Sequence, residues 1–268
     1  MESTGPLIPE QRHQRVLQLL RRDGVLSTRA LTDHLGVSHM TVRRDIAALE
    51  ASGQVVSVQG GVRLAGTAGQ VPPQERRQRA VLELPRKRAI AAAAAELVTD
   101  GMVVYLDAGT TCESVVAYLA GRRDLTVVTN DFYAVTALFD VPDIEVIHTG
   151  GAVDKESASS SGRLAAATLS AINLDLFFLS TGAWSVSRGV SAPTLDKVDL
   201  KRAAMTSAAT TVLLADSTKY GTASKFQVAP LDQLDLIITD TELPEATTKR
   251  IEELGVDLQL AELGVSAS

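Results

Sequence analysis

Residues 38–61 read SHMTVRRDIAALEASGQVVSVQGG, a pattern typical of an α-helix followed by a short β-hairpin. Ser38 is a favourable N-cap residue, because its hydroxyl can accept a hydrogen bond from a backbone N–H of the first turn. Three apolar residues recur at helical spacing and predict one buried face: Val42, Ile46 and Leu49. The Ser-Gly step that follows is predicted to end the helix, and the valines before the Gly-Gly pair to form the hairpin.

This helix is predicted to present polar and basic side chains to DNA. Helix N-termini favour phosphate, and adjacent arginines can donate paired hydrogen bonds to phosphate oxygens or to a guanine edge. The predicted DNA-binding residues are Ser38, His39, Thr41, Arg43 and Arg44 on the helix, with Gln59 in the hairpin. Two arginines on their own would more simply be a solvated surface, so the prediction depends on the elements around them.

Two further helices are predicted upstream of this segment. Residues 11–21 carry four apolar residues that would close a small core: Val16, Leu17, Leu19 and Leu20. Residues 27–35 form a shorter helix, and Gly36-Val37 supplies the tight turn of a helix-turn-helix. Three helices followed by a glycine-rich hairpin predict a winged helix-turn-helix DNA-binding domain over residues 1–63.

The composition excludes several classes of protein. With 268 residues, 45% of them hydrophobic and 22% charged, the chain has the ordinary usage of a globular protein with two modest domains. Its apolar runs are too short to span a bilayer, and its N-terminus lacks the pattern of a signal peptide. Cys112 is the single cysteine, and no Cys/His cluster is present in the sequence. We therefore expect no disulfide, metal site or cofactor, and a cytoplasmic location.

The formal net charge of −6 is unevenly distributed along the chain. Residues 1–90 hold 14 Lys and Arg against 8 Asp and Glu, whereas the remainder holds 12 against 24. A basic N-terminal third joined to an acidic remainder is expected when one domain meets phosphate and the other does not. We therefore expect affinity for DNA to fall as salt rises.

A second domain of α/β type is predicted after a linker. Residues 64–88 are rich in Gly, Pro and Arg and lack apolar periodicity, which predicts the linker. Its arginines at 76, 77 and 79 could contact the DNA backbone, but a solvated run of charges is the simpler expectation. From residue 89 to residue 261, short apolar strands alternate with helices, as in a mostly parallel sheet covered on both faces. Residues 262–268 are predicted to be a C-terminal tail.

Six predicted strands end in small or polar residues. The strands with their exits are residues 103–111, 125–131, 145–151, 176–182, 211–219 and 236–240. Ligands of open α/β sheets bind at the carboxyl ends of the strands, so these exits are predicted to form one polar pocket. Residues 107–111, DAGTT, precede a helix and offer the compact backbone and hydroxyl groups that suit an anion. Lys219 at another exit favours a phosphate site over an ordinary turn.

Segments in both predicted domains carry a family resemblance. The DeoR family of bacterial transcriptional regulators has an N-terminal domain similar to RHQRVLQLL, LTDHLGVSHMTVRRDIAALEASG and VSVQGGV. Its sensor domain, similar in fold to ribose-phosphate isomerases and glucosamine-phosphate deaminases, resembles KRAIAAAAAELVTDG, VVYLDAGTT, LTVVTND, VIHTGG, TLDKVDLKRAAM, LLADSTKYG and VAPLDQLDLIITD. The resemblance spans nearly the whole chain and implies a sensor for a phosphorylated sugar that controls operator affinity.

The resemblance also implies residues for the effector site. Phosphate would be bound by Asp107, Gly109, Thr110 and Thr111, with positive charge from Lys201 and Lys219. The pocket walls would include Thr129, Asn130, Gly150 and Gly151. Trp184 is not part of this pattern: as the single tryptophan after a strand, it could stack on the effector or close a lid over it, but packing in the core is the simpler expectation.

The chain departs from the family pattern at two places. The hairpin has Ser57, Val58 and Gln59 where the family commonly has a basic residue, an apolar residue and His. After the fourth strand, many members have Gly-Ala-Asp-Gly, whereas here Gly182 takes the place of the acid. The first departure removes a basic residue and a His that would contact DNA from the hairpin. The second removes a carboxylate from the predicted pocket.

Three single residues allow a plainer interpretation. Lys201 could instead be a surface lysine paired with Asp196 or Asp199, a contact of only a few tenths of a kcal/mol. Cys112 at a helix start could be a reactive thiolate, but a small buried filler is the simpler expectation. His148 is expected to be a hydrogen-bonded wall residue rather than a catalyst.

We expect a DNA-binding transcriptional regulator, a repressor of carbohydrate metabolism genes, whose operator affinity responds to a phosphorylated sugar or related metabolite. Operators read by paired helices require at least a dimer. The alternative is a sugar-phosphate isomerase or deaminase with a DNA-binding arm, for which Asp107, Asp131 and Asp216 are the available bases. A scaffold whose pocket binds no ligand is a third possibility.

Overall fold

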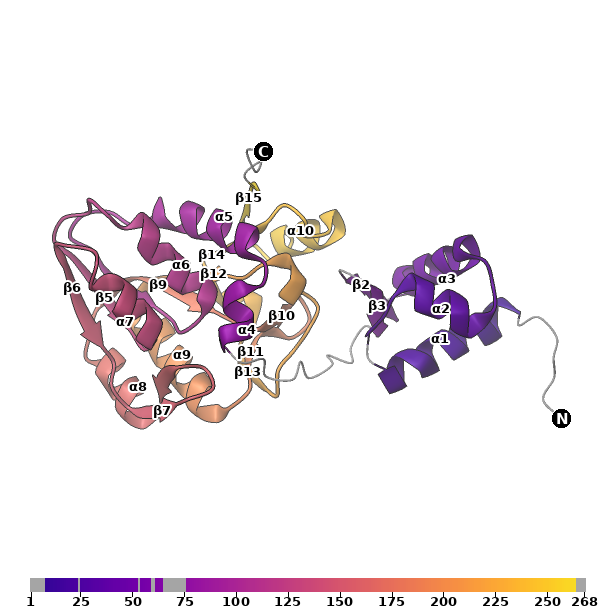
Figure 1. The fold of residues 1–268 in the computed structure, drawn as a ribbon, viewed down its shortest axis with the longest axis horizontal. Helices are drawn as coiled ribbons and strands as arrows, with labels where there is room; N and C mark the ends of the chain where they lie inside the picture. The colour runs from indigo at the N-terminus through magenta and orange to yellow at the C-terminus, as the bar shows by residue number, and fades with distance from the viewer. Residues whose placement is uncertain (1–7, 24, 53, 59–60, 65–75, 264–268) are drawn as a thin grey trace. The chain divides into compact units, whose positions relative to one another are not determined.

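The computed structural model describes residues 8–23, 25–52, 54–58, 61–64 and 76–263. The chain divides into two units, residues 1–69 and 70–268 (Figure 1). Each unit has a hydrophobic core of its own. Gln59, a predicted DNA contact, lies outside the described residues.

Within its described residues, the N-terminal unit consists of three helices and a small antiparallel sheet. Its elements are α1 (Pro9–Asp23), β1 (Val25–Leu26), α2 (Thr28–Leu35), α3 (His39–Ala51), β2 (Val55–Val58) and β3 (Gly61–Leu64). The strand order is β1-β3-β2. The core contains all the residues whose helical spacing predicted burial in the first and third helices: Val16, Leu17, Leu19, Leu20, Val42, Ile46 and Leu49. The winged helix-turn-helix prediction is confirmed.

Two caps build the turn between α2 and α3. Gly36 has a φ of 63°, a left-handed conformation that glycine adopts at little cost, and its N–H donates to the Thr32 carbonyl at 3.0 Å. Ser38 Oγ then accepts a hydrogen bond from the Thr41 N–H at 3.2 Å. Ser38 is therefore the N-cap of α3, as predicted.

An ion pair that the sequence pattern does not indicate joins α1 to α3. Asp45 follows the two arginines of α3 but is only 4% exposed. Arg12 donates to both of its carboxylate oxygens, at 2.8 and 2.9 Å, and His13 Nε2 lies 3.1 Å from one of them. A bidentate ion pair fixes the relative orientation of its two groups. The Arg12–Asp45 pair therefore fixes how α3 lies against α1, and with it the direction in which α3 presents Arg43 and Arg44.

The C-terminal unit is built on a parallel sheet of seven strands in the order β15-β14-β12-β9-β4-β5-β6. The strands are β4 (Val103–Leu106), β5 (Leu125–Thr129), β6 (Ile144–His148), β9 (Leu174–Ser180), β12 (Ala208–Leu214), β14 (Leu236–Asp240) and β15 (Asp257–Ala261). All neighbouring pairs in this sheet are parallel. The α/β prediction is confirmed, with β15 added at one edge.

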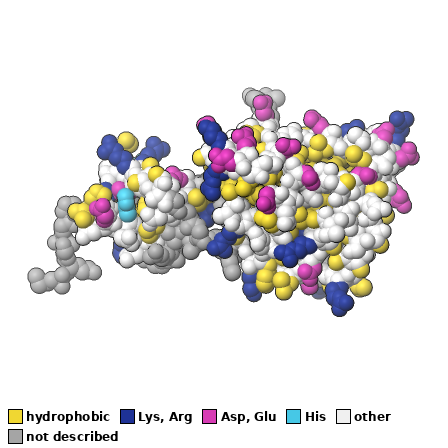
Figure 2. All heavy atoms as spheres, turned by 180° about the vertical axis from the view of Figure 1, so that it is seen from behind, with side chains coloured by type: hydrophobic (Ala, Val, Ile, Leu, Met, Phe, Trp, Pro, Cys, Tyr) yellow, Lys and Arg dark blue, Asp and Glu magenta, His cyan; other side chains and the backbone are white. Residues whose placement is uncertain are grey.

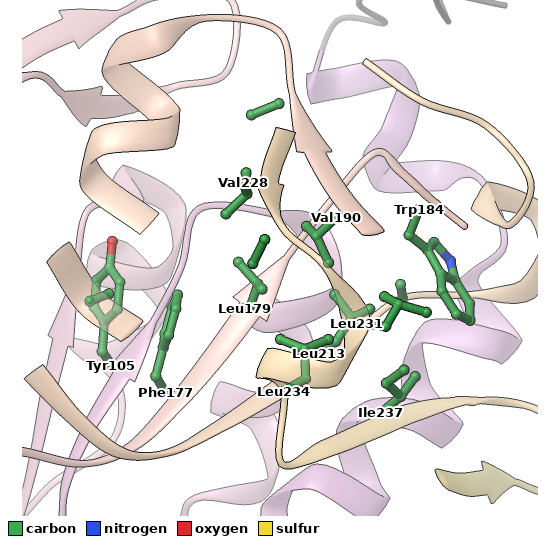
Figure 3. Packing of buried hydrophobic residues seen from close by; sticks show 14 of the residues in the cluster. Tyr105, Phe177, Leu179, Trp184, Val190, Leu213, Val228, Leu231, Leu234 and Ile237 are labelled. Carbon is green, nitrogen blue, oxygen red and sulfur yellow. The ribbon is translucent and has the colours of Figure 1, made fainter. Parts of the chain in front are cut away.

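Helices cover both faces of this sheet. One face packs against α5 (Leu84–Ala95), α6 (Thr110–Val115) and α7 (Phe132–Leu138), and the other against α8 (Arg163–Ser170), α9 (Leu195–Ser207) and α10 (Glu245–Glu252). Successive residues of a strand point to opposite faces, so Tyr105 belongs to the core under α8 and α9, and Leu106 to the core under α5. Tyr105 stacks on Phe177 with ring centroids 5.0 Å apart, and Figure 3 shows the two side chains next to each other. Within the described ranges, no helix is long and apolar enough to cross a membrane.

Two small antiparallel structures that the apolar pattern of the sequence does not predict extend from the sheet. The hairpin of β7 (Ala152–Asp154) and β8 (Ser159–Ser161) follows β6, and β10 (Ala183–Ser185), β11 (Gly189–Ala192) and β13 (Phe226–Ala229) form a three-stranded sheet. Gly151 leads into β7 with a φ of 106°, and a Cβ there would lie 2.6 Å from the Ser161 carbonyl oxygen. Glycine is therefore required for this turn.

Part of the predicted linker, residues 64–88, is helical and belongs to the C-terminal unit. Helix α4 (Arg76–Val81) is followed by α5. Arg76 is 3% exposed, and its guanidinium lies 2.6 Å from Glu113 and 2.9 Å from Asp131, so the expectation of a solvated arginine is wrong. Burial through ion pairs leaves no apolar period in the sequence, which is why the helix was missed.

Candidate functional site

The N-terminal half of α3 presents a polar and basic surface. His39, Arg43 and Arg44 are exposed, and Met40 beside them is 61% exposed. Among the described residues, neither Arg43 nor Arg44 has an ion-pair partner, so both guanidinium groups can reach an external acceptor. Figure 2 shows dark-blue basic side chains standing at the surface of the N-terminal unit.

The remaining predicted DNA contacts on α3 also cap the helix. Ser38 Oγ lies 2.9 Å from Thr41 Oγ1 in addition to accepting from the Thr41 N–H. Ser38 is exposed and Thr41 is half-buried. Both lie at the helix N-terminus, where the backbone dipole favours phosphate. The structure thus gathers the five predicted contacts of α3 at one end of the helix.

A cavity of about 440 Å³ lies in the C-terminal unit, where the loops after β4, β9 and β12 meet. Its other walls come from the β7–β8 turn, the start of α9 and the α4–α5 segment. Convergence of strand ends that are distant in the sequence is what a parallel sheet provides. The volume falls within the range of small-molecule pockets, about 300 to 1,000 Å³.

Five of the effector residues implied by the sequence line this cavity: Asp107, Thr110, Asn130, Lys201 and Lys219. Gly182, which replaces the expected acid, lines it too. A Cβ built on Gly182 meets no atom within 4 Å. The lost carboxylate therefore leaves room in the cavity that a ligand can use.

The other implied effector residues lie outside the cavity wall: Gly109, Thr111, Thr129, Gly150, Gly151 and Trp184. Several hold the wall in place. Thr129 Oγ1 donates to a carbonyl of β4 at 2.7 Å. The Gly109 N–H donates to Asp131 Oδ2 at 3.0 Å, and the Ala108 N–H donates to Asn130 Oδ1 at 2.8 Å. Two amides that the sequence offered to phosphate therefore already have partners within the chain.

Trp184 packs in the core beside the cavity. It is fully buried and meets the Tyr220 ring edge-on, with centroids 5.0 Å apart. Figure 3 shows it at the opposite end of the cluster from Tyr105. Gly182 of the cavity wall lies two residues before Trp184, and the Trp184 carbonyl accepts a hydrogen bond from the Gly221 N–H at 2.8 Å. The single tryptophan is thus a fluorescent reporter close to the wall.

Lys201 and Asp107 form a buried ion pair in the wall. Lys201 is 7% exposed, and its Nζ contacts the Asp107 carboxylate and donates to the Ser180 carbonyl at 2.8 Å. Asp107 also accepts from the Ser180 N–H at 2.9 Å. The alternative of a surface lysine paired with Asp196 or Asp199 is wrong. Because the two charges neutralise each other, this pair suits the hydroxyl groups of a ligand better than its phosphate.

Lys219 lines the cavity beside a carboxylate and a threonine hydroxyl. Lys219 Nζ lies 3.1 Å from Asp216 Oδ2 and 3.4 Å from Thr111 Oγ1. Burial acts to raise the pKa of Asp216, but Lys219 and a hydrogen bond from Thr218 bring that pKa below its ordinary value. The Asp216 carboxylate is therefore ionised at neutral pH, and an ammonium beside a hydroxyl group is a suitable donor set for phosphate.

Three further basic side chains line the cavity and were not assigned to it from the sequence: Arg79, Lys87 and Lys197. Lys197 pairs with Asp154 at 2.7 Å. It precedes Lys201 by four residues, so helical spacing places both on one face of α9 and could have indicated it. Arg79 and Lys87 come from the segment interpreted as linker, and only the tertiary packing brings them here.

Cys112 and His148 have structural roles. Cys112 is fully buried and its Sγ donates to the Phe178 carbonyl at 3.3 Å. Burial raises the pKa of the thiol, which supports the filler interpretation over a redox sensor. His148 stacks on Phe132 with centroids 4.9 Å apart, and its Nδ1 accepts from the Gly150 N–H at 3.1 Å.

Comparisons with known proteins give two family matches in the chain. Residues 12–68 match the DeoR-like helix-turn-helix domain, and residues 83–241 match the DeoR C terminal sensor domain. The chain is 41% identical over 255 residues to the uncharacterized HTH-type transcriptional regulator YgbI of Escherichia coli (strain K12), covering 95% of this chain and 99% of that protein. It is 25% identical over 250 residues to the glycerol-3-phosphate regulon repressor of the same strain, covering 93% and 98%. A solved structure of ribose 5-phosphate isomerase A from Methanocaldococcus jannaschii aligns with a TM-score of 0.37 and 18% identity, covering 50% of this chain and 53% of that chain.

Proposed function

The chain belongs to the DeoR family of transcriptional regulators, and we propose that a phosphorylated sugar or related metabolite in the cavity of the C-terminal unit sets its affinity for operator DNA. The mechanism is a population shift. The effector binds one arrangement of the chain better than another, and the coupling free energy appears as a change in DNA affinity.

For DNA, the proposal assigns recognition to the exposed end of α3. This is the second helix of the helix-turn-helix, the element that enters the major groove. Arg43 and Arg44 can each donate two hydrogen bonds to guanine or phosphate, and Ser38, His39 and Thr41 lie beside them. These five residues form the proposed DNA-binding surface.

The observation that carries the effector proposal is the gathering of basic side chains around one cavity: Arg79, Lys87, Lys197, Lys201 and Lys219. A phosphate requires charge-assisted donors, and the hydroxyl groups of a sugar require mixed donors and acceptors such as the Asp107–Lys201 pair. The relative named for glycerol 3-phosphate, matched over 98% of its length, supports a small phosphorylated polyol as the ligand class.

An isomerase or deaminase with a DNA-binding arm is the less favoured function. Proton transfer requires a carboxylate or histidine that is available as a base. The three carboxylates considered from the sequence each have a cationic partner, in the pairs Asp107–Lys201, Asp131–Arg76 and Asp216–Lys219. We therefore assign no catalytic residue.

We further propose that the protein is an oligomer in the cytoplasm. Operators are read by paired recognition helices, so the active form is at least a dimer, with the contact between copies made by the C-terminal unit. A regulator of chromosomal genes works in the cytoplasm.

The test is fluorescence anisotropy of the full chain on its own upstream DNA, at fixed salt, with and without a panel of sugar phosphates. Tight binding that one phosphate alters is the expected result. DNA binding that no sugar phosphate of the panel alters would contradict the effector proposal and support a scaffold with an empty pocket. The scaffold also predicts that no ligand stabilises the fold. A true effector at a hundred times its dissociation constant should add about 2.7 kcal/mol to stability. Failure to bind DNA, with turnover of sugar phosphates, would favour the enzyme.

Two variants test the phosphate site in the same assay. Lys219→Ala and Thr110→Val should keep operator affinity and weaken effector binding about 10- to 100-fold, the loss expected for a charge-assisted hydrogen bond of about 1.5 to 3 kcal/mol. Lys249→Ala on α10, whose side chain is 67% exposed, is the matched control. A response that survives both changes would mean that the phosphate binds elsewhere.

A further inference from the structure

Arg76 is a buried arginine to which the proposed effector site gives no role. It is the first residue of α4, and its side chain is 4% exposed. Its Nη2 donates to Glu113 on α6 at 2.6 Å, and its Nη1 lies 2.9 Å from Oδ2 of Asp131, the N-cap residue of α7. The guanidinium also lies 4.4 Å from the centroid of the Tyr133 ring. One side chain therefore joins the start of α4 to α6 and α7.

Two donors approach Asp131 Oδ2, and only one of them has the alignment of a hydrogen bond. The Gly109 N–H donates to this oxygen at 3.0 Å. Arg76 Nη1 lies equally close, but it is buried and has no hydrogen-bond partner among the described residues. A buried donor without an acceptor is unfavourable. The Arg76–Asp131 ion pair is therefore in contact without the hydrogen bond that would strengthen it.

Gly109 connects this ion pair to the cavity. It lies between Ala108 and Thr110, which both line the cavity. A backbone N–H has a single proton to donate. An anion bound beside Thr110 would therefore compete with Asp131 for the Gly109 N–H.

We propose that Asp131 Oδ2 is a two-position switch that couples the cavity to α4 through Arg76. In the structure it accepts from the Gly109 N–H; when an effector anion takes that N–H, it accepts from Arg76 Nη1 instead. The proposal rests on the effector function proposed above and adds the route by which occupancy changes α4. Helix α4 is the first described element after residues 65–75, which join it in sequence to the DNA-binding unit.

The surrounding contacts favour a small rotation of the carboxylate over its displacement. Asp131 Oδ1 accepts from the first N–H groups of α7 at 2.8 and 3.2 Å, and these bonds can persist in both positions. Burial raises the pKa of Asp131 and of Glu113, and Arg76 opposes both shifts. A buried carboxylate that loses the Gly109 N–H therefore gains from a hydrogen bond to the guanidinium. Two such arrangements are the bistable element that coupling between sites requires.

The test combines isothermal titration calorimetry with DNA anisotropy on the full chain, using ribose 5-phosphate, glycerol 3-phosphate and inorganic phosphate. In the wild type, a saturating ligand should change operator affinity about 5- to 150-fold. Asp131→Asn keeps an N-cap oxygen for α7 but removes the charge and one acceptor, so Gly109 is free for the anion. This variant should bind phosphate at least as tightly as the wild type, and its operator affinity should change less than about twofold.

Arg76→Met should also lose the response, but with the opposite effect on ligand affinity. The anion must then take the Gly109 N–H with no compensating bond to Asp131, so phosphate should bind about tenfold more weakly. Glu113→Gln is the matched control, because it neutralises the other partner of Arg76 and leaves Asp131 in place; it should keep the response. Arg88→Ala, an exposed residue of α5, should match the wild type.

The outcomes separate this proposal from the effector function. A full response in Asp131→Asn, weaker phosphate binding by Asp131→Asn, or an equal loss of response in Glu113→Gln overturns the switch alone. If the wild type binds none of the three ligands and no sugar phosphate of the panel, or binds one without a DNA response, the effector function fails and the switch fails with it.

A measurement on the wild type covers the case in which a variant does not fold, which urea unfolding followed by Trp184 fluorescence would reveal. Hydrogen exchange of residues 76–81 should slow when phosphate binds, because Arg76 gains an acceptor that holds the start of α4. Unchanged exchange in a protein that binds phosphate overturns the switch.

Discussion

The recognition surface on α3 and the effector cavity hold their charges in opposite ways. Arg43 and Arg44 are exposed and have no ion-pair partner among the described residues. Lys201 and Asp107 are almost fully buried and face each other. The two arginines lose their hydration water only when DNA binds, whereas Lys201 and Asp107 lost theirs when the domain folded. Substitution should therefore separate binding from stability on α3 and affect both together in the cavity.

Net charge is a poor guide to which unit meets DNA. Residues 1–69 hold 8 Lys and Arg against 6 Asp and Glu, a much smaller excess than that of the first 90 residues. Six basic residues of that longer count belong to α4 and α5: Arg76, Arg77, Arg79, Arg86, Lys87 and Arg88. The N-terminal unit therefore meets phosphate through the positions of a few exposed arginines rather than through a large net charge.

Removing the exposed arginines should give the largest effect. Arg43→Ala with Arg44→Ala should weaken operator binding about 1,000-fold, since each base or phosphate contact contributes about 1 to 3 kcal/mol. Because neither side chain pairs within the described chain, the free energy of unfolding should change by at most about 0.5 kcal/mol. Anisotropy at physiological salt measures the first quantity, and urea unfolding the second. Arg123→Ala, whose side chain is 82% exposed in the C-terminal unit, is the control. Near-normal operator affinity would remove α3 as the recognition helix.

Breaking the buried pair should give the next largest effect, and on stability. Lys201→Met leaves the Asp107 carboxylate buried, with the Ser180 N–H as its remaining hydrogen-bond donor among the residues that the structure describes, which should cost about 3 kcal/mol of unfolding free energy. Urea unfolding followed by Trp184 fluorescence measures this loss.

A double variant gives the control for the pair. Asp107→Asn removes the charge that Lys201→Met exposes, while its amide oxygen can still accept from the Ser180 N–H. The double variant should therefore be more stable than Lys201→Met alone. Losses that simply add would show that Lys201 and Asp107 do not act as a pair.

Apolar periodicity predicted the elements whose buried faces are apolar. Val42, Ile46 and Leu49 indicated α3, and apolar runs indicated six strands of the parallel sheet. The helices of residues 76–88 were not predicted, because the side chains that they bury are charged. Arg86, for example, is 5% exposed and lies 2.6 Å from Asp240. A sequence shows that an arginine is present but not that a carboxylate distant in the chain will cover it.

The candidate site was predictable where a strand end faces the cavity, as at Asp107, Thr110 and Lys219. The site was not predictable where the direction of a side chain decides whether the residue lines the cavity. Thr129 stands at the end of β5, yet its hydroxyl turns back to β4. The β7–β8 hairpin contributes Asp154 to the wall through a turn that no hydrophobic pattern specifies.

The smallest effect is expected at Asp154, which shares features of both regions: its side chain is 29% exposed, and it pairs with Lys197 at 2.7 Å. Burial acts to raise the pKa of Asp154, but hydrogen bonds from Lys197 and Ser157 lower it to about 2. A lowered folded-state pKa stabilises the fold above about pH 4, and this contribution is lost as pH falls toward 2. Asp154→Asn should therefore cost at most about 1 kcal/mol near neutral pH, because solvent screens the pair. In urea unfolding, its difference from the wild type should shrink between about pH 5 and about pH 3. A loss as large as that of Lys201→Met, or one independent of pH, would place Asp154 with the buried pairs rather than between the two regions.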